Sequence, residues 1–178
     1  MERKALAKPE TWTTRDGRTV TIRPIRAADF ALERAFVDGL SAATGYQRLM
    51  STRRLSDDEV RHFTDIDPRR ELALIAVTVV DGKERQVGVA RYVKDEHTPG
   101  EAEFAIVLSD AWQRCGLGAK LLASLIDAAR RNGVRRLVAT TLSSNNGMLA
   151  LARRMGFTLA LNAASATITN LTLELDAK

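Results

Sequence analysis

The stretch "AWQRCGLGAKLL", residues 111–122, places two glycines at the start of a strongly apolar helix pattern. Leucine and alanine recur after it at helical spacing, which predicts a helix over residues 116–131. A glycine costs a helix interior about 1 kcal/mol relative to alanine, so Gly116 and Gly118 need an explanation. One explanation is a plain glycine turn before the helix. The other is that a phosphate group must approach the backbone at the helix N-terminus.

Two common phosphate-binding motifs do not fit this stretch. A Walker loop needs four residues between its glycines and then Lys-Ser or Lys-Thr. The dinucleotide fingerprint needs a third glycine where Leu121 stands. What remains is Gln-x-x-Gly-x-Gly over residues 113–118, between a predicted strand and a predicted helix. Unpaired N–H groups at such a helix start attract a pyrophosphate, and Arg114 and Lys120 add positive charge.

Composition places the chain in a broad class. Its 178 residues fit one domain, and 45% hydrophobic with 28% charged residues is typical of a globular protein. The single cysteine excludes an internal disulfide, which favours a reducing compartment. The N-terminal "MERKALAKPE" lacks the apolar segment of a secretory signal, and no apolar run is long enough to cross a membrane. We therefore expect a cytoplasmic protein that does not bind a membrane.

The net charge of +5 raises the question of nucleic acid as a partner. Five Arg-Arg pairs contribute to it, but they are scattered along the chain, and aromatic residues make up only 5% of it. This distribution favours a small anionic ligand over nucleic acid. The pairs occupy positions 53–54, 69–70, 130–131, 135–136 and 153–154.

Hydrophobic periodicity predicts the element order β-α-α-β-β-β-α-β-α-β-β, an α/β fold with a mixed sheet and helices on both faces. We assign residues 1–18 to an N-terminal extension and residues 19–178 to a single domain. A capping-box pattern begins the second helix, and Asp81-Gly82 predicts a hairpin turn. The predicted strands are 19–25, 71–80, 85–93, 101–108, 135–142, 157–161 and 166–175; the predicted helices are 27–40, 56–66, 116–131 and 144–155.

The Gln-x-x-Gly-x-Gly segment over residues 113–118 resembles the acetyl-CoA-binding motif of the GCN5-related N-acetyltransferase (GNAT) superfamily. The order of elements is similar to that superfamily too: strand, motif, amphipathic helix, strand, and then "SNNGMLALARRMGF". The resemblance implies acetyl-CoA as cosubstrate, with its pyrophosphate bound at the glycine loop. No cluster of His, Cys and carboxylate residues has metal-ligand spacing, so we expect no metal. The resemblance also implies that the backbones of Ile106 and Leu108 bind the pantetheine arm, with the Leu108 N–H facing the thioester oxygen. The loop residues that it implies as cofactor-binding are Gln113, Arg114, Cys115, Gly116, Leu117, Gly118, Ala119 and Lys120.

A narrower resemblance follows from the segments "GLSAATGYQRLMSTRRLSDDEVRHFTDIDPRRELALIAV", "GVARYV" and "AEFAIVLSDAWQRCGLGAKLL". They look like the acetyltransferase domain of bacterial Pat-type protein lysine acetyltransferases. This resemblance implies a protein substrate with an exposed lysine, acyl-CoA synthetases among the candidates. Many members carry a further large domain, which is not found in these 178 residues. The sequence leaves open whether the protein is a monomer or a homodimer.

Catalysis requires a base, because an amine attacks a thioester only in its uncharged form. The strand "EAEFAIVL" offers Glu101 and Glu103 on one face. Both could simply lie at a solvated strand end. The resemblance points to Glu103 as the catalytic base, with Glu101 as the fallback.

Other positions leave alternatives open. Many superfamily members have a tyrosine where Ala152 stands, so the acid for the leaving thiolate is missing unless Tyr46 or Tyr92 replaces it. Asn145 fits a helix N-cap, and the resemblance adds a contact to pantetheine. Cys115, at a helix N-terminus, should be reactive and protected by bound acetyl-CoA. Besides protein lysine, the acceptor could be a small amine, or the chain could be a non-catalytic acyl-CoA sensor.

Overall fold

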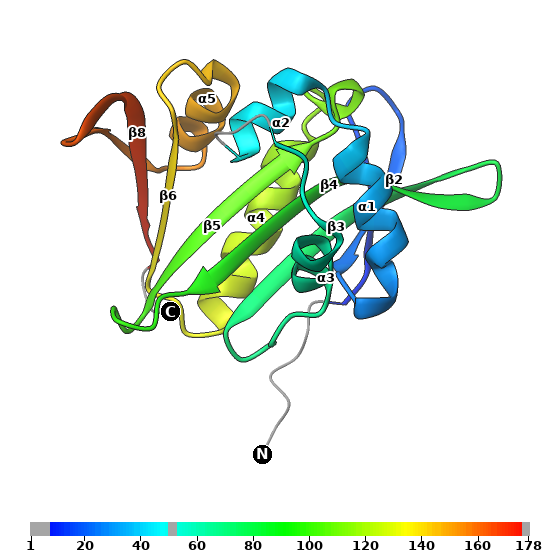
Figure 1. Cartoon of the computed structure of the whole chain (residues 1–178), viewed down its shortest axis with the longest axis horizontal. Helices are drawn as coiled ribbons and strands as arrows, with labels where there is room; N and C mark the ends of the chain where they lie inside the picture. Colours follow the sequence, from blue (N-terminus) through cyan, green and yellow to red (C-terminus); the bar gives the residue numbers. More distant parts are fainter. Residues whose placement is uncertain (1–7, 50–52, 176–178) are drawn as a thin grey trace.

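The computed structural model describes residues 8–49 and 53–175, which form one mixed sheet with helices on both faces (Figure 1). The strand order is β1-β2-β3-β4-β5-β6-β8-β7, and only the β5–β6 pair is parallel. The strands are β1 (Glu10–Thr13), β2 (Thr19–Pro24), β3 (Glu71–Val80), β4 (Lys83–Lys94), β5 (Glu101–Leu108), β6 (Arg136–Leu142), β7 (Thr158–Asn162) and β8 (Ser165–Glu174). The helices are α1 (Phe30–Asp38), α2 (Ala42–Leu49), α3 (Asp57–Thr64), α4 (Leu117–Arg131) and α5 (Asn146–Arg154), with short 3-10 turns η1 (Ala27–Asp29) and η2 (Asp110–Trp112).

The central strand β3 explains why the core has two layers. Its side chains alternate between the faces of the sheet, and it is apolar at almost every position. Leu72 and Leu74 pack under α4, whereas Ala73 and Ile75 pack under α1. The α4 layer is the larger, and four leucines of α4 in it are fully buried, namely Leu117, Leu121, Leu122 and Leu125.

The predicted fold class is confirmed, and β3 and β5 have the predicted bounds. Two elements were not predicted. The four-residue strand β1 pairs with β2 through Thr11↔Thr21, so the sheet begins inside the segment assigned to an N-terminal extension. Helix α2 was missed because its eight residues include a glycine and no long apolar stripe. The hairpin turn at Asp81-Gly82 is confirmed, since both residues have positive φ, 51° and 73°.

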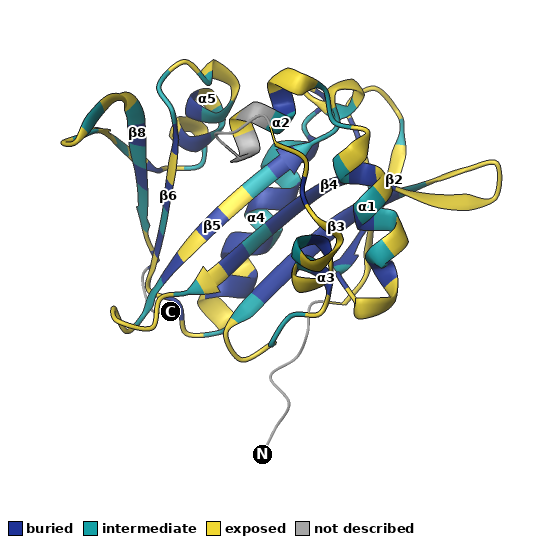
Figure 2. Cartoon of the chain, in the orientation of Figure 1, coloured by how far each residue is buried: buried dark blue, intermediate teal, exposed yellow. Residues whose placement is uncertain are grey.

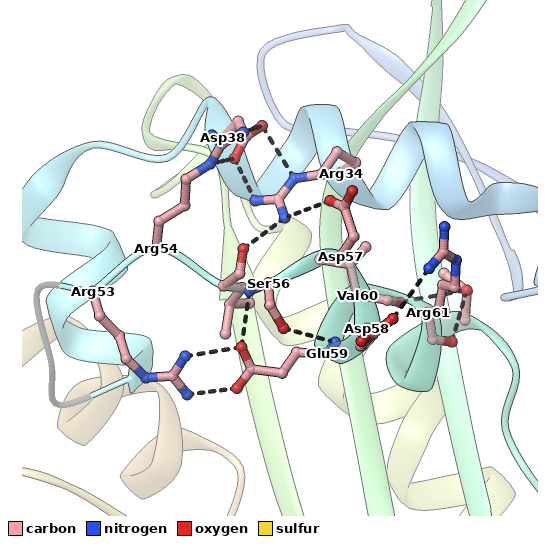
Figure 3. Close-up of polar contacts among 12 residues, drawn as sticks. Arg34, Asp38, Arg53, Arg54, Ser56, Asp57, Asp58, Glu59, Val60 and Arg61 are labelled. Carbon is pink, nitrogen blue, oxygen red and sulfur yellow. Dashed lines mark hydrogen bonds and ion pairs between the residues drawn. The ribbon is translucent and has the colours of Figure 1, made fainter.

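Arginine–carboxylate pairs fix the connection that leads into α3 (Figure 3). Asp38, at the end of α1, accepts hydrogen bonds from Arg34 and from Arg54, the latter at 2.7 and 3.1 Å. Arg53 donates two hydrogen bonds to Glu59, at 2.5 and 2.8 Å, and the Ser56–Glu59 capping box begins α3 as predicted. The Arg53 hydrogen bonds, with the Ser56 N–H, hold the pKa of Glu59 at about 2.

Acid should weaken this cluster. Because the folded-state pKa of Glu59 lies below its ordinary value of 4.5, its contribution to stability is complete above about pH 4.5 and is lost as the pH falls toward 2. We expect Glu59→Gln to lower Tm at pH 7 and to show a smaller fall of Tm between pH 4.5 and 2 than the wild type. Thermal unfolding followed by circular dichroism measures both. Asp127→Asn, on the remote helix α4, controls for loss of a surface carboxylate; equal acid slopes for wild type and Glu59→Gln would contradict the assignment.

Candidate active site

The site begins where β5 and β6 separate. Their pairing extends only from Glu101↔Arg136 to Glu103↔Val138, and beyond it the two strands diverge (Figure 1). Glu101 accepts from the Asp95 N–H and Ser109 donates to Val87, so the odd-numbered residues of β5 pair with β4. The N–H and C=O groups of Ile106 and Leu108 therefore point to the opposite edge, where β6 no longer pairs. This edge can accept an extended ligand as an additional strand.

The glycine loop lies at the end of this opening. Gly116 has φ +91°, a left-handed conformation that glycine adopts without strain, and it is the N-cap of α4. Among the described residues, no side chain caps this helix and no acceptor pairs with the N–H groups of Leu117, Gly118 and Ala119. Unpaired N–H groups and the helix dipole together make an anion site.

The second glycine has a packing role that the sequence did not reveal. A Cβ on Gly118 would lie 3.3 Å from Cδ1 of Leu108 and 3.5 Å from Cδ2 of Leu151. Glycine therefore lets the first turn of α4 pack closely against the end of β5 and against α5. The close approach that the sequence assigned to phosphate is made here by two leucine side chains.

Three other loop residues use their side chains for structure. The Cys115 thiol is buried and donates to the Trp112 carbonyl at 3.0 Å, and the Leu117 side chain is fully buried. Lys120 Nζ pairs with Glu10 at 2.6 Å, which offsets the positive charge predicted for the phosphate. The backbone N–H groups of Cys115 and Leu117 stay at the loop, but the expected reactivity of the Cys115 thiol does not fit its burial. Arg114, in contrast, is exposed, with φ 59°.

Gln113 connects the loop to α2. Its amide Nε2 lies 3.4 Å from the Leu108 carbonyl, from Thr44 Oγ1 and from Asp110 Oδ1. Thr44 in α2 donates to Asp110 at 2.5 Å, and the hydrogen bonds from Thr44 and Ser41 lower the pKa of Asp110. The end of β5 is thus held against α2. Sequence reasoning missed Thr44 and Asp110, which carry no motif.

The two candidate bases differ in their surroundings. Glu101 lies 3.4 Å from Arg136, which also bonds to Glu174 at 2.6 Å. Glu103 is exposed, and no cation among the described residues pairs with it. It is the last residue of β5 that pairs with β6, and the face around it is uncovered: Figure 2 shows exposed residues in the middle of β5. The geometry therefore presents a free carboxylate at the vertex of the opening.

The comparison with known proteins assigns the family. Residues 45–157 match the model of the "Acetyltransferase (GNAT) family". The chain belongs to the GNAT acetyltransferase family. It is 37% identical over 143 residues to "Acetyltransferase PA5475" of Pseudomonas aeruginosa, which is 80% of this chain and 76% of that protein.

Two solved structures share the acetyltransferase fold. The GNAT domain of S. lividans PAT superposes with a TM-score of 0.84 at 27% identity, covering 94% of this chain and 97% of that one. The putative acetyltransferase yncA of Salmonella typhimurium, solved with its cofactor acetyl-CoA, has a TM-score of 0.68 at 24% identity, covering 88% and 94%.

Asn145 and Tyr92, two further residues for which the sequence predicted a role in the acetyltransferase, make hydrogen bonds within the fold. Asn145 is the N-cap of α5: its Oδ1 accepts from the Met148 N–H at 3.1 Å. A contact between Asn145 and pantetheine stays a prediction. Tyr92 is buried and accepts from Asn132 at 2.9 Å, so it cannot protonate a leaving group at the opening. The Tyr46 side chain lies outside the described part of the chain.

The described residues contain no group of three or more His, Cys, Asp or Glu side chains that could hold a metal ion. Within the same part of the chain, no helix is both long enough and apolar enough to cross a membrane.

The burial of Cys115 gives a test of the loop geometry. We expect a thiol reagent to modify the native protein far more slowly than the urea-unfolded protein, because the Cys115 sulfur is shielded and hydrogen-bonded. Thiol titration under both conditions measures the two rates. Rapid stoichiometric modification of the native protein would contradict the buried position.

Proposed function

We propose that the protein transfers the acetyl group of acetyl-CoA directly to the side-chain amine of a protein lysine, with Glu103 as general base. The observation that carries this proposal is the free carboxylate of Glu103 at the vertex of the β5–β6 opening. The carboxylate and the unpaired strand edge belong to one strand, so a thioester along the edge and an amine at Glu103 can be held by the same element.

Two sets of backbone groups would hold the cofactor. The N–H groups at the start of α4, from Gly116 to Ala119, suit the pyrophosphate. The Ile106 and Leu108 backbones suit the amide groups of the pantetheine arm. The fold shared with the acetyl-CoA complex of the Salmonella protein supports this arrangement.

The chemistry needs few groups. Glu103, directly or through a water molecule, takes a proton from the lysine ammonium, and the free amine attacks the thioester carbon. The Leu108 N–H donates to the oxygen that becomes negative in the tetrahedral intermediate. The C–N bond forms, the C–S bond breaks, and CoA leaves as a thiolate. The nitrogen then loses its second proton to the thiolate or to water, and Glu103 releases its proton to water. A thiol with a pKa near 8.5 leaves without an acid, so alanine at position 152 is compatible with turnover.

The lysine acceptor is supported by the 27% identity and TM-score of 0.84 to the GNAT domain of S. lividans PAT. The exposed face of β5 at Glu103 and Ala105 leaves room for a side chain that protrudes from a protein surface. We propose acyl-CoA synthetases as candidate substrates, no nucleic-acid partner, and either a monomer or a homodimer. The free thiol of Cys115 is consistent with action in the cytoplasm.

Replacing Glu103 should change the turnover rate without changing the affinity for acetyl-CoA. We expect Glu103→Gln to lower kcat by about 10²–10⁴-fold, the usual contribution of general base catalysis, with little change in the Kd of acetyl-CoA. Steady-state rates and calorimetric titration measure the two quantities. Glu101→Gln is the matched control on the same face of β5 and should change kcat much less. Near-normal turnover of Glu103→Gln would remove Glu103 as the base.

The acceptor class has a direct test. The protein is incubated with acetyl-CoA and a bacterial lysate, and new acetyl groups are located by mass spectrometry. We expect lysine acetylation above a no-enzyme control, absent with Glu103→Gln. CoA release in the presence of small amines without protein labelling would favour a small-amine acetyltransferase. Binding of acetyl-CoA without either product would favour a sensor.

A further inference from the structure

The turn between β1 and β2, residues 14–18, packs against the glycine loop and makes hydrogen bonds to its backbone. The Arg15 N–H donates to the Cys115 carbonyl at 3.1 Å. Arg18 donates to the Ala111 carbonyl at 2.9 Å, and its guanidinium lies 3.9 Å from the centre of the Trp112 ring. The turn thus contacts the loop on both sides of Gln113.

The turn is itself closely held. The Thr14 N–H donates to the Arg18 carbonyl at 2.8 Å, and Gly17 has φ 85°. Asp16 pairs with Arg18 at 2.6 Å, and the hydrogen bonds from Arg18 and Thr14 lower the pKa of Asp16 to about 2. Asp16, the one carboxylate of the turn, is therefore paired with Arg18 and not with Arg15.

Arg15 lies against the loop without such a partner. A Cβ on Gly116 would be 3.3 Å from Arg15 Nε and 3.5 Å from Arg15 Cγ. The Arg15 side chain is exposed, and within the described residues no carboxylate pairs with it. Lys120, which the sequence favoured as a phosphate ligand, is paired with Glu10. The charge available at this side of the loop is that of Arg15.

We infer that Arg15 binds the pyrophosphate of CoA, so that the N-terminal hairpin completes the cofactor site. This inference rests on the proposed function. A guanidinium donates in a planar fork that matches phosphate oxygens, and the unpaired N–H groups of α4 start at the glycine that Arg15 touches. The backbone bond to Cys115 fixes the position of Arg15 before the ligand arrives, which reduces the entropy cost of binding.

The test compares Arg15→Gln, Arg15→Lys and a matched loss of one exposed cation, Lys83→Gln at the β3–β4 turn. Calorimetric titration gives Kd for CoA, for dephospho-CoA, which lacks the 3′-phosphate, and for S-acetylpantetheine, which lacks every phosphate of CoA. We expect Arg15→Gln to raise Kd about 10-fold for CoA and for dephospho-CoA at low salt, and less at 0.5 M salt. Arg15→Lys should stay closer to wild type, and Lys83→Gln unchanged.

Four outcomes would overturn the inference. Equal CoA affinity of wild type and Arg15→Gln would do so while leaving the proposed function intact. A loss confined to CoA and absent for dephospho-CoA would reject the pyrophosphate. An equal loss for S-acetylpantetheine, or a lower Tm without ligand, would make Arg15 a structural residue. Failure of the wild type to bind CoA would remove the proposed function as well, and the wild-type titration alone shows that case.

Discussion

The packing of the first turn of α4 against the end of β5 positions both halves of the site. Leu108 and Leu151 pack closely against the backbone of Gly118, where a Cβ would lie 3.3 and 3.5 Å from their methyl groups, and the buried leucines of α4 hold the rest of the helix on the sheet. Because of this contact, the unpaired N–H groups at the start of α4 lie beside Leu108, at the end of β5, where the edge toward β6 has no strand partner. A displaced helix would separate the anion site from the strand edge.

The short parallel contact between β5 and β6 is the second constraint. Three residue pairs join the two halves of the sheet, and the remaining edge of β5 is left without a strand partner. An unpaired edge inside a sheet costs hydrogen bonds that neighbouring strands would normally supply. In an enzyme this cost is acceptable, since a substrate can supply the missing partners. Glu103, at the last pair, marks where the protein's own pairing ends.

Sequence reasoning succeeded where the chain repeats one physical pattern over several residues. The apolar run of β3, the alternation of β5 and the leucine spacing of α4 predicted the elements, and the glycines predicted the loop. It failed where the decisive contact joins distant residues. The contacts of Thr44 with Asp110 and of Arg15 with Gly116 have no local signature, because Thr44, Asp110 and Arg15 belong to no motif and meet their partners only in the folded chain. Burial of Cys115 was missed for the same reason, since the side from which the core approaches a loop is a tertiary property. The strand β1 was missed because its four residues are too few to show an alternating pattern, and because it is defined by its pairing with β2.

The link between the N-terminal hairpin and the loop also bears on how the chain folds. Arg18 and Ala111 are 93 residues apart in sequence, and the hairpin is synthesised first. The glycine loop is synthesised only after β3, β4 and β5. Until then, the groups of the hairpin that later contact the loop are exposed to water. Contacts between such distant segments are expected to form late, because the entropy cost of closing the chain between them is first offset by formation of the intervening sheet. We therefore expect the central strands to assemble before the turn at residues 14–18 packs against the glycine loop.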